Sequence, residues 1–236
     1  MLLPEEEDFA IGSKYAPELE KQMGGRIEDQ NLQTYINGVG EKIARVSHKQ
    51  QWEFHFTALN DKSVNAFALP GGHIFITKAM LEHIQTEAQL AAILAHETVH
   101  VVARDTSNVM SNEIGISLLL SAVTSEETSQ GVMTAANLTQ KIIGLRYSRK
   151  DEQEADLGGM SYMVAAGYNP YGMVDTMQML QGLQKVKTIK FLSSHPSPEN
   201  RVGYLTEEIQ MKYQNLTGLK IAGEDYRRAV LDRLKK

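Results

Sequence analysis

The stretch LAAILAHETVH, residues 90–100, places an H-E-x-x-H pattern at the end of an apolar helix. Thr86 followed by Gln89 forms a capping-box pattern, which predicts that the helix begins there and runs to about Ala103. Four residues of a helix turn by about 400°. His96 and His100 are therefore expected one turn apart on the same face.

Two imidazoles on one helical face can bind a single cation. Glu97 is offset by one residue from His96, so its carboxylate is placed to reach a water molecule on that cation, where a general base is needed. The alternative is a polar helix face with two hydrogen-bonded histidines. The pattern favours a zinc site, because a catalytic zinc ion needs such ligands beside a water.

A catalytic zinc ion usually has three protein ligands, so one more is expected. The residues after His100 include no histidine before Asp105, which excludes the metzincin arrangement. A later segment carries Glu152 and Asp156 at positions i and i+4, on one helical face. Glu152 is predicted to be the third ligand, and Asp156 to accept a proton from a metal-bound imidazole. Glu154 points elsewhere on the helix.

The composition limits the remaining possibilities. Hydrophobic residues make up 42% of the 236 residues and charged residues 22%, which excludes a disordered, collagen-like or coiled-coil chain. The net charge of −5 argues against a general electrostatic affinity for nucleic acid or anionic lipid. There is no cysteine, so a metal must be held by His, Asp or Glu. No apolar run is long enough for a membrane-spanning helix, and the N-terminus as given is not a signal peptide.

The pattern along the chain predicts an α+β fold that is mostly helical, in one domain covering residues 1–236. Alternating residues over 52–59 and two short segments, 64–69 and 73–77, predict a small β-sheet beside the H-E-x-x-H helix. Helical spacing, caps and Gly or Pro boundaries predict the other elements. Helices are expected over 5–23, 29–46, 78–84, 86–103, 108–123, 127–166, 170–186, 198–213 and from 224 onward.

Several motifs together resemble one metallopeptidase family. They are His96-Glu97-x-x-His100, then Ser148-Arg149-x-x-Glu152-x-x-Ala155-Asp156, then His195-Pro196 with Arg201. The set resembles the gluzincin family that contains HtpX, BepA and the CAAX prenyl endopeptidases. The stretch NAFALPGG, residues 65–72, and the absence of membrane helices make the chain most similar to the BepA/LoiP-like envelope proteases. The likeness spans residues 5–205 and includes no tetratricopeptide domain, so it does not extend to the partner docking of that domain.

The resemblance implies a role for each matching position. His96, His100 and Glu152 would bind zinc, one ion per chain, and Glu97 would activate the hydrolytic water. His195 would either stabilise the oxyanion or occupy the open position of the metal in a resting form. The alternative for His195 is a packed residue in a loop.

Other expectations concern the surroundings of the metal. Arg201 is expected to hold the His195 loop through an ion pair with an acid near the metal. The segment Asn65, Ala66, Phe67 and Ala68 is expected to be an edge strand that binds an extended peptide substrate through its backbone. The segment 115–144 is expected to be a mobile cap over the cleft.

The sequence therefore predicts a zinc-dependent endopeptidase, a hydrolase that cleaves unfolded or misassembled proteins in protein quality control. The alternative is a metal-stabilised chaperone or adaptor with a latent protease site. A purely structural zinc site is disfavoured, since such sites usually have four protein ligands. The partner is a protein or peptide substrate, without nucleic acid. The resemblance places the protein in the bacterial periplasm or cell envelope, with a signal or lipid-attachment segment removed, whereas the residues themselves leave a cytoplasmic location open.

Overall fold

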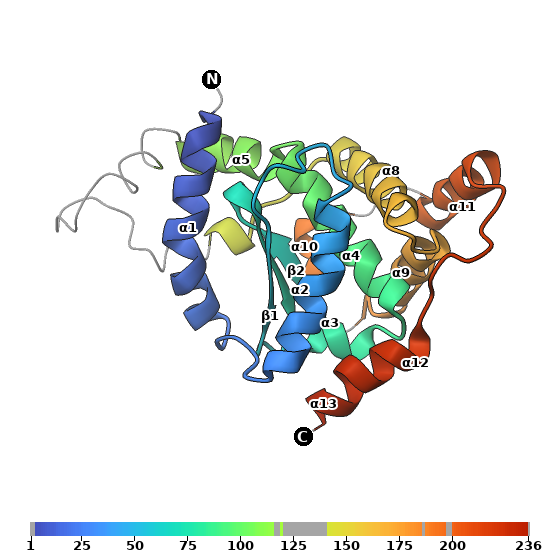
Figure 1. Cartoon of the computed structure of the whole chain (residues 1–236). Coiled ribbons are helices and arrows are strands. Elements are labelled where there is room, and N and C mark those ends of the chain that lie inside the picture. Colours follow the sequence, from blue (N-terminus) through green and yellow to red (C-terminus); the bar gives the residue numbers. More distant parts are fainter. Residues whose placement is uncertain (1–2, 116–118, 120–140, 186, 197–199, 236) are drawn as a thin grey trace, which may run out of the picture.

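The structure is a computed structural model that describes residues 3–115, 119, 141–185, 187–196 and 200–235. Among these residues it confirms an α+β fold that is mostly helical (Figure 1). The elements follow in the order α1 (Glu5–Gln22), α2 (Gln30–Ala44), β1 (His55–Leu59), β2 (Ala66–Ala68), β3 (His73–Thr77), α3 (Lys78–His83), α4 (Glu87–Val102), α5 (Asp105–Met110), α8 (Arg149–Ala165), α9 (Tyr171–Gly182), α10 (Phe191–Ser194), α11 (Arg201–Lys212), α12 (Gly223–Tyr226) and α13 (Asp232–Leu234).

The three strands form one mixed sheet in the order β1-β3-β2. β1 runs parallel to β3, with His55 opposite His73, whereas β2 runs antiparallel to β3, with Phe67 opposite Phe75. The turn Pro70–Gly72 connects β2 to β3. Gly71 lies in this turn at φ 75°, and a Cβ there would come 2.7 Å from the backbone of α1. Glycine is therefore required where α1 crosses the turn.

Alternate residues of the sheet face two separate cores, as the pleat requires. One face contributes Ala66, Ala68, Ile74 and Ile76 to the main core, which contains α2, α4 and α8. The opposite face contributes Phe67 and Phe75 to a smaller core under α1, together with Leu19 and Ile142. The alanines of β2 have small side chains, which lets the H-E-x-x-H helix α4 pack close to this strand.

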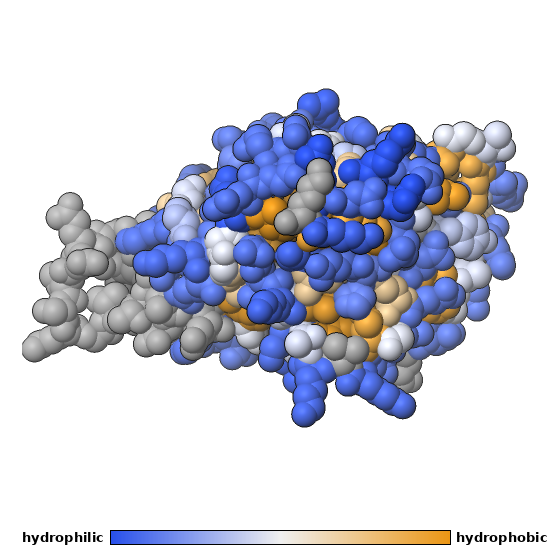
Figure 2. Space-filling model, turned by 90° about the horizontal axis from the view of Figure 1, so that it is seen from below, coloured by the Kyte–Doolittle hydropathy of each residue, from blue (hydrophilic) through white to orange (hydrophobic). Residues whose placement is uncertain are grey.

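Helix α4 lies in the centre of the main core, between the sheet and the helices α8 and α9 (Figure 1). Its predicted capping box is present: Gln89 N–H donates to Thr86 Oγ1, and Gln89 Oε1 accepts from Thr86 N–H. All residues of α4 from Glu87 to Val101 are buried. Within the described residues, no helix is both long and apolar enough to cross a bilayer. Figure 2 shows one face of the molecule, on which apolar patches are scattered among hydrophilic side chains.

The prediction of one long helix over 127–166 is wrong for its described part. Residues 144–148 are not helical, and α8 begins only at Arg149. The physical reason is a capping box, in which the Asp151 N–H donates to Ser148 Oγ and Ser148 N–H donates to Asp151 Oδ2. This local start competes successfully with continuation of the preceding helix.

Other boundaries differ by a few residues. The strand predicted over 52–59 begins at His55, and the helix predicted over 170–186 ends at Gly182. The helix predicted over 108–123 begins earlier, at Asp105, and passes into a π-helical turn over Ser111–Gly115. Its remainder, apart from Leu119, lies outside the described residues, as do most of the proposed cap over 115–144 and the start of the helix expected at 198.

Candidate metal centre

Helix α4 brings its two histidines onto one face, as their spacing predicts. The Nε2 atoms of His96 and His100 lie 3.1 Å apart, with the ring planes at 83°. Both side chains are fully buried. A histidine is seldom buried without hydrogen-bond partners, so each ring must have its other nitrogen satisfied.

Helix α8 supplies the carboxylate. Glu152 Oε1 lies 3.3 Å from His100 Nε2, and Glu152 Oε2 lies 3.6 Å from His96 Nε2. The two helices pack closely because Gly159 faces α4, where a Cβ would lie 3.1 Å from the backbone nitrogen of His96. Glu154 lies on the exposed side of α8 and pairs with Lys150, as expected from its helical position.

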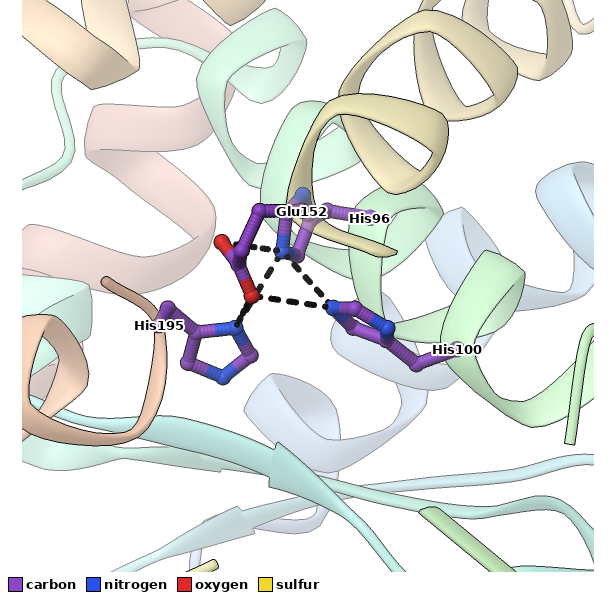
Figure 3. Close-up of side chains that lie close together, drawn as sticks. All are labelled: His96, His100, Glu152 and His195. Carbon is purple, nitrogen blue, oxygen red and sulfur yellow. Dashed lines mark hydrogen bonds and ion pairs between the residues drawn. The ribbon is translucent and has the colours of Figure 1, made fainter. Parts of the chain in front are cut away.

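The short helix α10 ends beside the same group and delivers a third imidazole, that of His195 (Figure 3). Its Nδ1 lies 2.8 Å from Glu152 Oε1 and 3.3 Å from His96 Nε2. The ring of Phe191 stacks on His195 with a centroid separation of 4.2 Å. His195 is thus a buried member of the cluster rather than a residue of an unrelated loop.

The four side chains converge on one point. His96, His100, Glu152 and His195 each offer a donor atom, and these atoms all lie within 4.8 Å of one another. The donor atoms around a tetrahedral zinc ion are separated by about 3.3 Å, since the bonds are about 2.0–2.2 Å long. The measured separations of 2.8–3.6 Å bracket that value. Nitrogen and carboxylate oxygen donors are suitable for zinc.

Several carboxylate and imidazole atoms at the cluster form no hydrogen bond within the described part of the protein. Among the described residues, Glu97 Oε1 and Oε2, Glu152 Oε2 and His195 Nε2 are buried with no hydrogen-bond partner. Unpartnered buried carboxylate oxygens are costly, because desolvation favours their neutral form. The residues present therefore fit a metal ion with a water molecule beside it.

Carboxylates also hold the outer nitrogen of each α4 histidine. His96 Nδ1 lies 3.0 Å from Asp156 Oδ1, and His100 Nδ1 lies 2.9 Å from Asp105 Oδ2. This contact keeps the proton on Nδ1 and leaves Nε2 free to coordinate. Asp105 was not expected from the sequence. The sequence feature that could have indicated it is a carboxylate just after the end of the helix, five residues beyond His100.

Arg201 makes the ion pair that the sequence led us to expect, with an acid of α8. Its Nε and Nη2 lie 2.5 Å from the two oxygens of Asp156, and Nη2 lies 3.3 Å from Glu152 Oε2. Tyr204 donates a further hydrogen bond to Asp156. Arg201 begins α11 just after the His195 segment, so it ties this part of the chain to α8. The role of Arg201 and Asp156 in metal binding stays a prediction.

Tyr147 is a second residue that sequence reasoning missed. Its ring lies face to face with that of His100, with centroids 3.9 Å apart and planes at 7°. Its hydroxyl and that of Thr106 are 2.9 Å apart. The tyrosine immediately precedes Ser148, the cap of α8, so the only signal was an aromatic residue next to a helix start. The stacking restrains the orientation of the His100 ring.

The charges in the cluster favour a cation. Burial raises the pKa of Glu152, but the nearby imidazoles of His195 and His96 lower it by more, so the pKa lies well below its usual value. Burial lowers the pKa of His100, but its hydrogen bonds to Asp105 and Glu152 raise it to about 9. The raised pKa of His100 favours a positive charge beside the buried carboxylates, which is the same electrostatic requirement that a metal ion meets.

Glu97 and the strand β2 complete the surroundings. Glu97 is fully buried, and its Oε1 lies 3.4 Å from His195 Nε2. Among the described strands, β2 lies at the edge of the sheet, as expected. Its pairing with β3 leaves the backbone groups of Ala66 and Ala68 turned away from the sheet, as the alternation of an antiparallel pair requires. Catalysis by Glu97 and substrate binding by Asn65–Ala68 stay predictions.

Comparison with known proteins identifies the family. Residues 28–209 match Peptidase family M48. The chain belongs to this family. It is 29% identical over 210 residues to the beta-barrel assembly-enhancing protease of Yersinia pestis, an alignment covering 84% of this chain and 43% of the relative.

Two further relatives are a protease of the same name and a metalloendopeptidase. The beta-barrel assembly-enhancing protease of Escherichia coli (strain K12) is 26% identical, over 83% of this chain and 42% of the relative. The mitochondrial metalloendopeptidase OMA1 of Schizosaccharomyces pombe is 32% identical, over 75% of this chain and 54% of the relative. This M48 chain therefore spans less than half the length of the assembly-enhancing proteases and about half that of OMA1. The family resemblance expected from the motifs is confirmed.

Proposed function

We propose that this M48 chain is a zinc-dependent endopeptidase, with residues 1–236 forming one catalytic domain. The observation that carries the proposal is the convergence of His96, His100 and Glu152 beside Glu97, a buried carboxylate that accepts no hydrogen bond among the described residues. The H-E-x-x-H arrangement and the family support hydrolysis of peptide bonds. The choice of zinc rests on the His and Glu donors and their near-tetrahedral separations.

His96, His100 and Glu152 would hold the metal, which supplies Lewis acidity for a carbonyl oxygen and for water. Glu97 accepts the proton of the attacking water and transfers it to the leaving amine. Neither oxygen accepts a hydrogen bond among the described residues, and only His195 Nε2 approaches Oε1, at 3.4 Å, so the carboxylate is available for this transfer. Asp156 and Asp105 keep His96 and His100 in the tautomer that coordinates.

We assign to His195 the role of closing the cluster in the resting form. Its Nδ1 faces the same point as the other three donors, and the whole cluster is fully buried. A substrate must therefore displace His195 before its carbonyl reaches the metal. After this displacement, the same imidazole would donate a hydrogen bond to the oxyanion. The two roles expected from the sequence would then follow one another in the reaction cycle.

The substrates are proposed to be unfolded or misassembled proteins of the cell envelope. An extended segment would pair with the outward backbone groups of Ala66 and Ala68, which read little side-chain information. The periplasmic or envelope location rests on the names of the beta-barrel assembly-enhancing relatives and on the resemblance of the motifs.

The test is cleavage of casein by metal-loaded protein, compared between the wild type and Glu97→Gln. The proposal predicts that Glu97→Gln retains the metal and the fold but loses activity by at least about 100-fold, because it cannot accept a proton. Wild-type turnover by Glu97→Gln would contradict the mechanism.

A second candidate is a chaperone or adaptor with a latent protease site. It is favoured by one observation, the complete burial of Glu97, His195 and the ligand set. It predicts that the metal-loaded wild type binds unfolded casein but does not cleave it, and that Glu97→Gln binds equally well.

A further inference from the structure

A cavity of about 630 Å³ lies beside the start of β2, and it is distinct from the metal cluster. Asn65 and Ser194 are among the residues that line it. Asn65 directly precedes β2, and Ser194 directly precedes His195. The cavity therefore adjoins both the proposed peptide-binding edge and the residue that closes the cluster.

The segment before α10, residues 188–190, is held beside β2 by backbone hydrogen bonds. The backbone N–H groups of Lys190 and Phe191 donate to Val64 O at 3.1 and 3.2 Å, and Val64 N–H donates to Thr188 O at 3.0 Å. Val64 and Ile189 form an isolated parallel bridge. The side chains of this segment are thus held next to the edge strand rather than left on a free loop.

Three lysines are among the residues that line the cavity: Lys62, Lys187 and Lys190. All three residues are exposed, and within the described chain none of their side chains has an acidic partner. Among the described residues of the lining, Asp61 carries the one carboxylate, and its Oδ1 already accepts hydrogen bonds from the N–H and the hydroxyl of Ser63. The cavity is therefore positive although the chain as a whole carries −5.

An independent observation points to a peptide at the same place. Asn65 is buried to 1% exposure, and its Oδ1 has no hydrogen-bond partner among the described residues. A buried amide oxygen without a donor is uncommon in a folded protein. A backbone N–H of a peptide passing along the edge would satisfy it. The apolar residues Met23 and Ile143 also line the cavity and suit the short aliphatic part of an acidic side chain.

We propose that this cavity is a specificity subsite for an acidic substrate residue, so that the enzyme prefers peptides with Asp or Glu at one fixed position near the cleaved bond. The carboxylate is held by Lys62, Lys187 and Lys190, and the peptide N–H by Asn65. The proposal rests on the proposed function, because it deepens the specificity of the same site.

The expected preference is moderate. An exposed carboxylate–ammonium pair contributes a few-fold at most, so three lysines together give about a tenfold preference in kcat/KM for Glu over Gln. Because the lysines are exposed, the preference should decrease as salt is raised from about 0.05 to 0.5 M.

The experiment digests a pool of random peptides with metal-loaded enzyme and identifies the new termini by mass spectrometry. The wild type is compared with Lys187→Glu/Lys190→Glu, and with Lys185→Glu as control, an exposed lysine of the same segment that does not line the cavity. We expect Asp and Glu to be enriched about tenfold over Asn and Gln at one position. The enrichment disappears or changes to Lys and Arg in the double variant and persists in the control.

A wild type without acidic enrichment, or a double variant with unchanged enrichment, overturns the subsite. If either result accompanies cleavage that Glu97→Gln abolishes, the proposed function stands and only the subsite fails. Cleavage that persists in Glu97→Gln overturns the proposed function instead.

A binding measurement keeps the subsite testable without turnover. Fluorescence anisotropy compares a labelled Glu-containing peptide with its Gln counterpart on the Glu97→Gln protein, with and without Lys187→Gln/Lys190→Gln. Tighter binding of the Glu peptide that the lysine substitutions remove supports the proposal, and equal affinities or no binding contradict it.

Discussion

The Oδ1 atom of Asp156 lies 3.0 Å from Nδ1 of His96, which leaves the Nε2 atom of the same ring facing Glu152. Asp156 is also the acid that Arg201 contacts through two nitrogens. Burial raises the pKa of Asp156, but the charge of Arg201 and the hydrogen bond with His96 lower it by more, so this carboxyl stays ionised. One carboxylate thus joins α4, α8 and α11 behind the proposed metal.

Asp156→Asn is expected to weaken zinc binding by about 10–100-fold, because the amide no longer fixes the His96 tautomer. It should also destabilise the protein by about 3–5 kcal/mol, since the buried Arg201 loses the charge of its nearest carboxylate and keeps only the longer contact with Glu152. Competition with a zinc chelator and urea unfolding measure the two effects. Glu154→Gln on the exposed side of α8 is the control. Equal zinc affinity in both variants would contradict the role of Asp156.

His195→Ala is expected to speed the loss of zinc to a chelator. The substitution removes the donor that closes the cluster and opens the space between Phe191 and Glu152. The rate of zinc transfer to a coloured chelator measures this directly. His83→Ala, a histidine at the end of α3, is the matched control. An unchanged transfer rate in His195→Ala would mean that His195 does not cap the metal.

Glu87→Gln is expected to reduce stability in a pH-dependent way. Glu87, at the start of α4, accepts hydrogen bonds from Lys220, Tyr35 and Tyr168. Burial raises its pKa, but these three contacts, Lys220 first, lower it by more, so the pKa lies below its usual value. The contribution of the carboxylate is therefore fully present above the unfolded pKa and is lost as pH falls through the folded pKa.

The expected difference between wild type and Glu87→Gln is about 1–3 kcal/mol at pH 7, and it should shrink below pH ~4. Urea unfolding at a series of pH values measures it. A difference that stays constant down to the lowest pH would show that the charge of Glu87 is not responsible.

The sequence predicted the parts of the site that depend on local helical spacing. His96 and His100 at i and i+4, and Glu152 and Asp156 at i and i+4, share faces because the helical period is fixed. The structure brings these pairs together through Gly159, where the two helices touch. The α+β fold followed from the same periodicities, since residues of the short strands alternate between two cores.

The contacts that sequence reasoning missed join segments that no periodicity relates. Asp105 reaches His100 from the next helix, and Tyr147 reaches it from the residues before α8. The start of α8 was also missed, because the capping box of Ser148 and Asp151 competes with a helical pattern that continues on both sides. Complete burial of the cluster is a property of tertiary packing, so spacing alone does not reveal it.

The central claim is that His96, His100 and Glu152 bind one zinc ion. The most direct measurement is metal content by mass spectrometry for the wild type, Glu152→Ala and Glu154→Ala, each incubated with zinc and then dialysed. We predict one zinc ion per chain in the wild type and in Glu154→Ala, and none retained in Glu152→Ala. A wild type without zinc, or equal zinc content in all three proteins, would contradict the account.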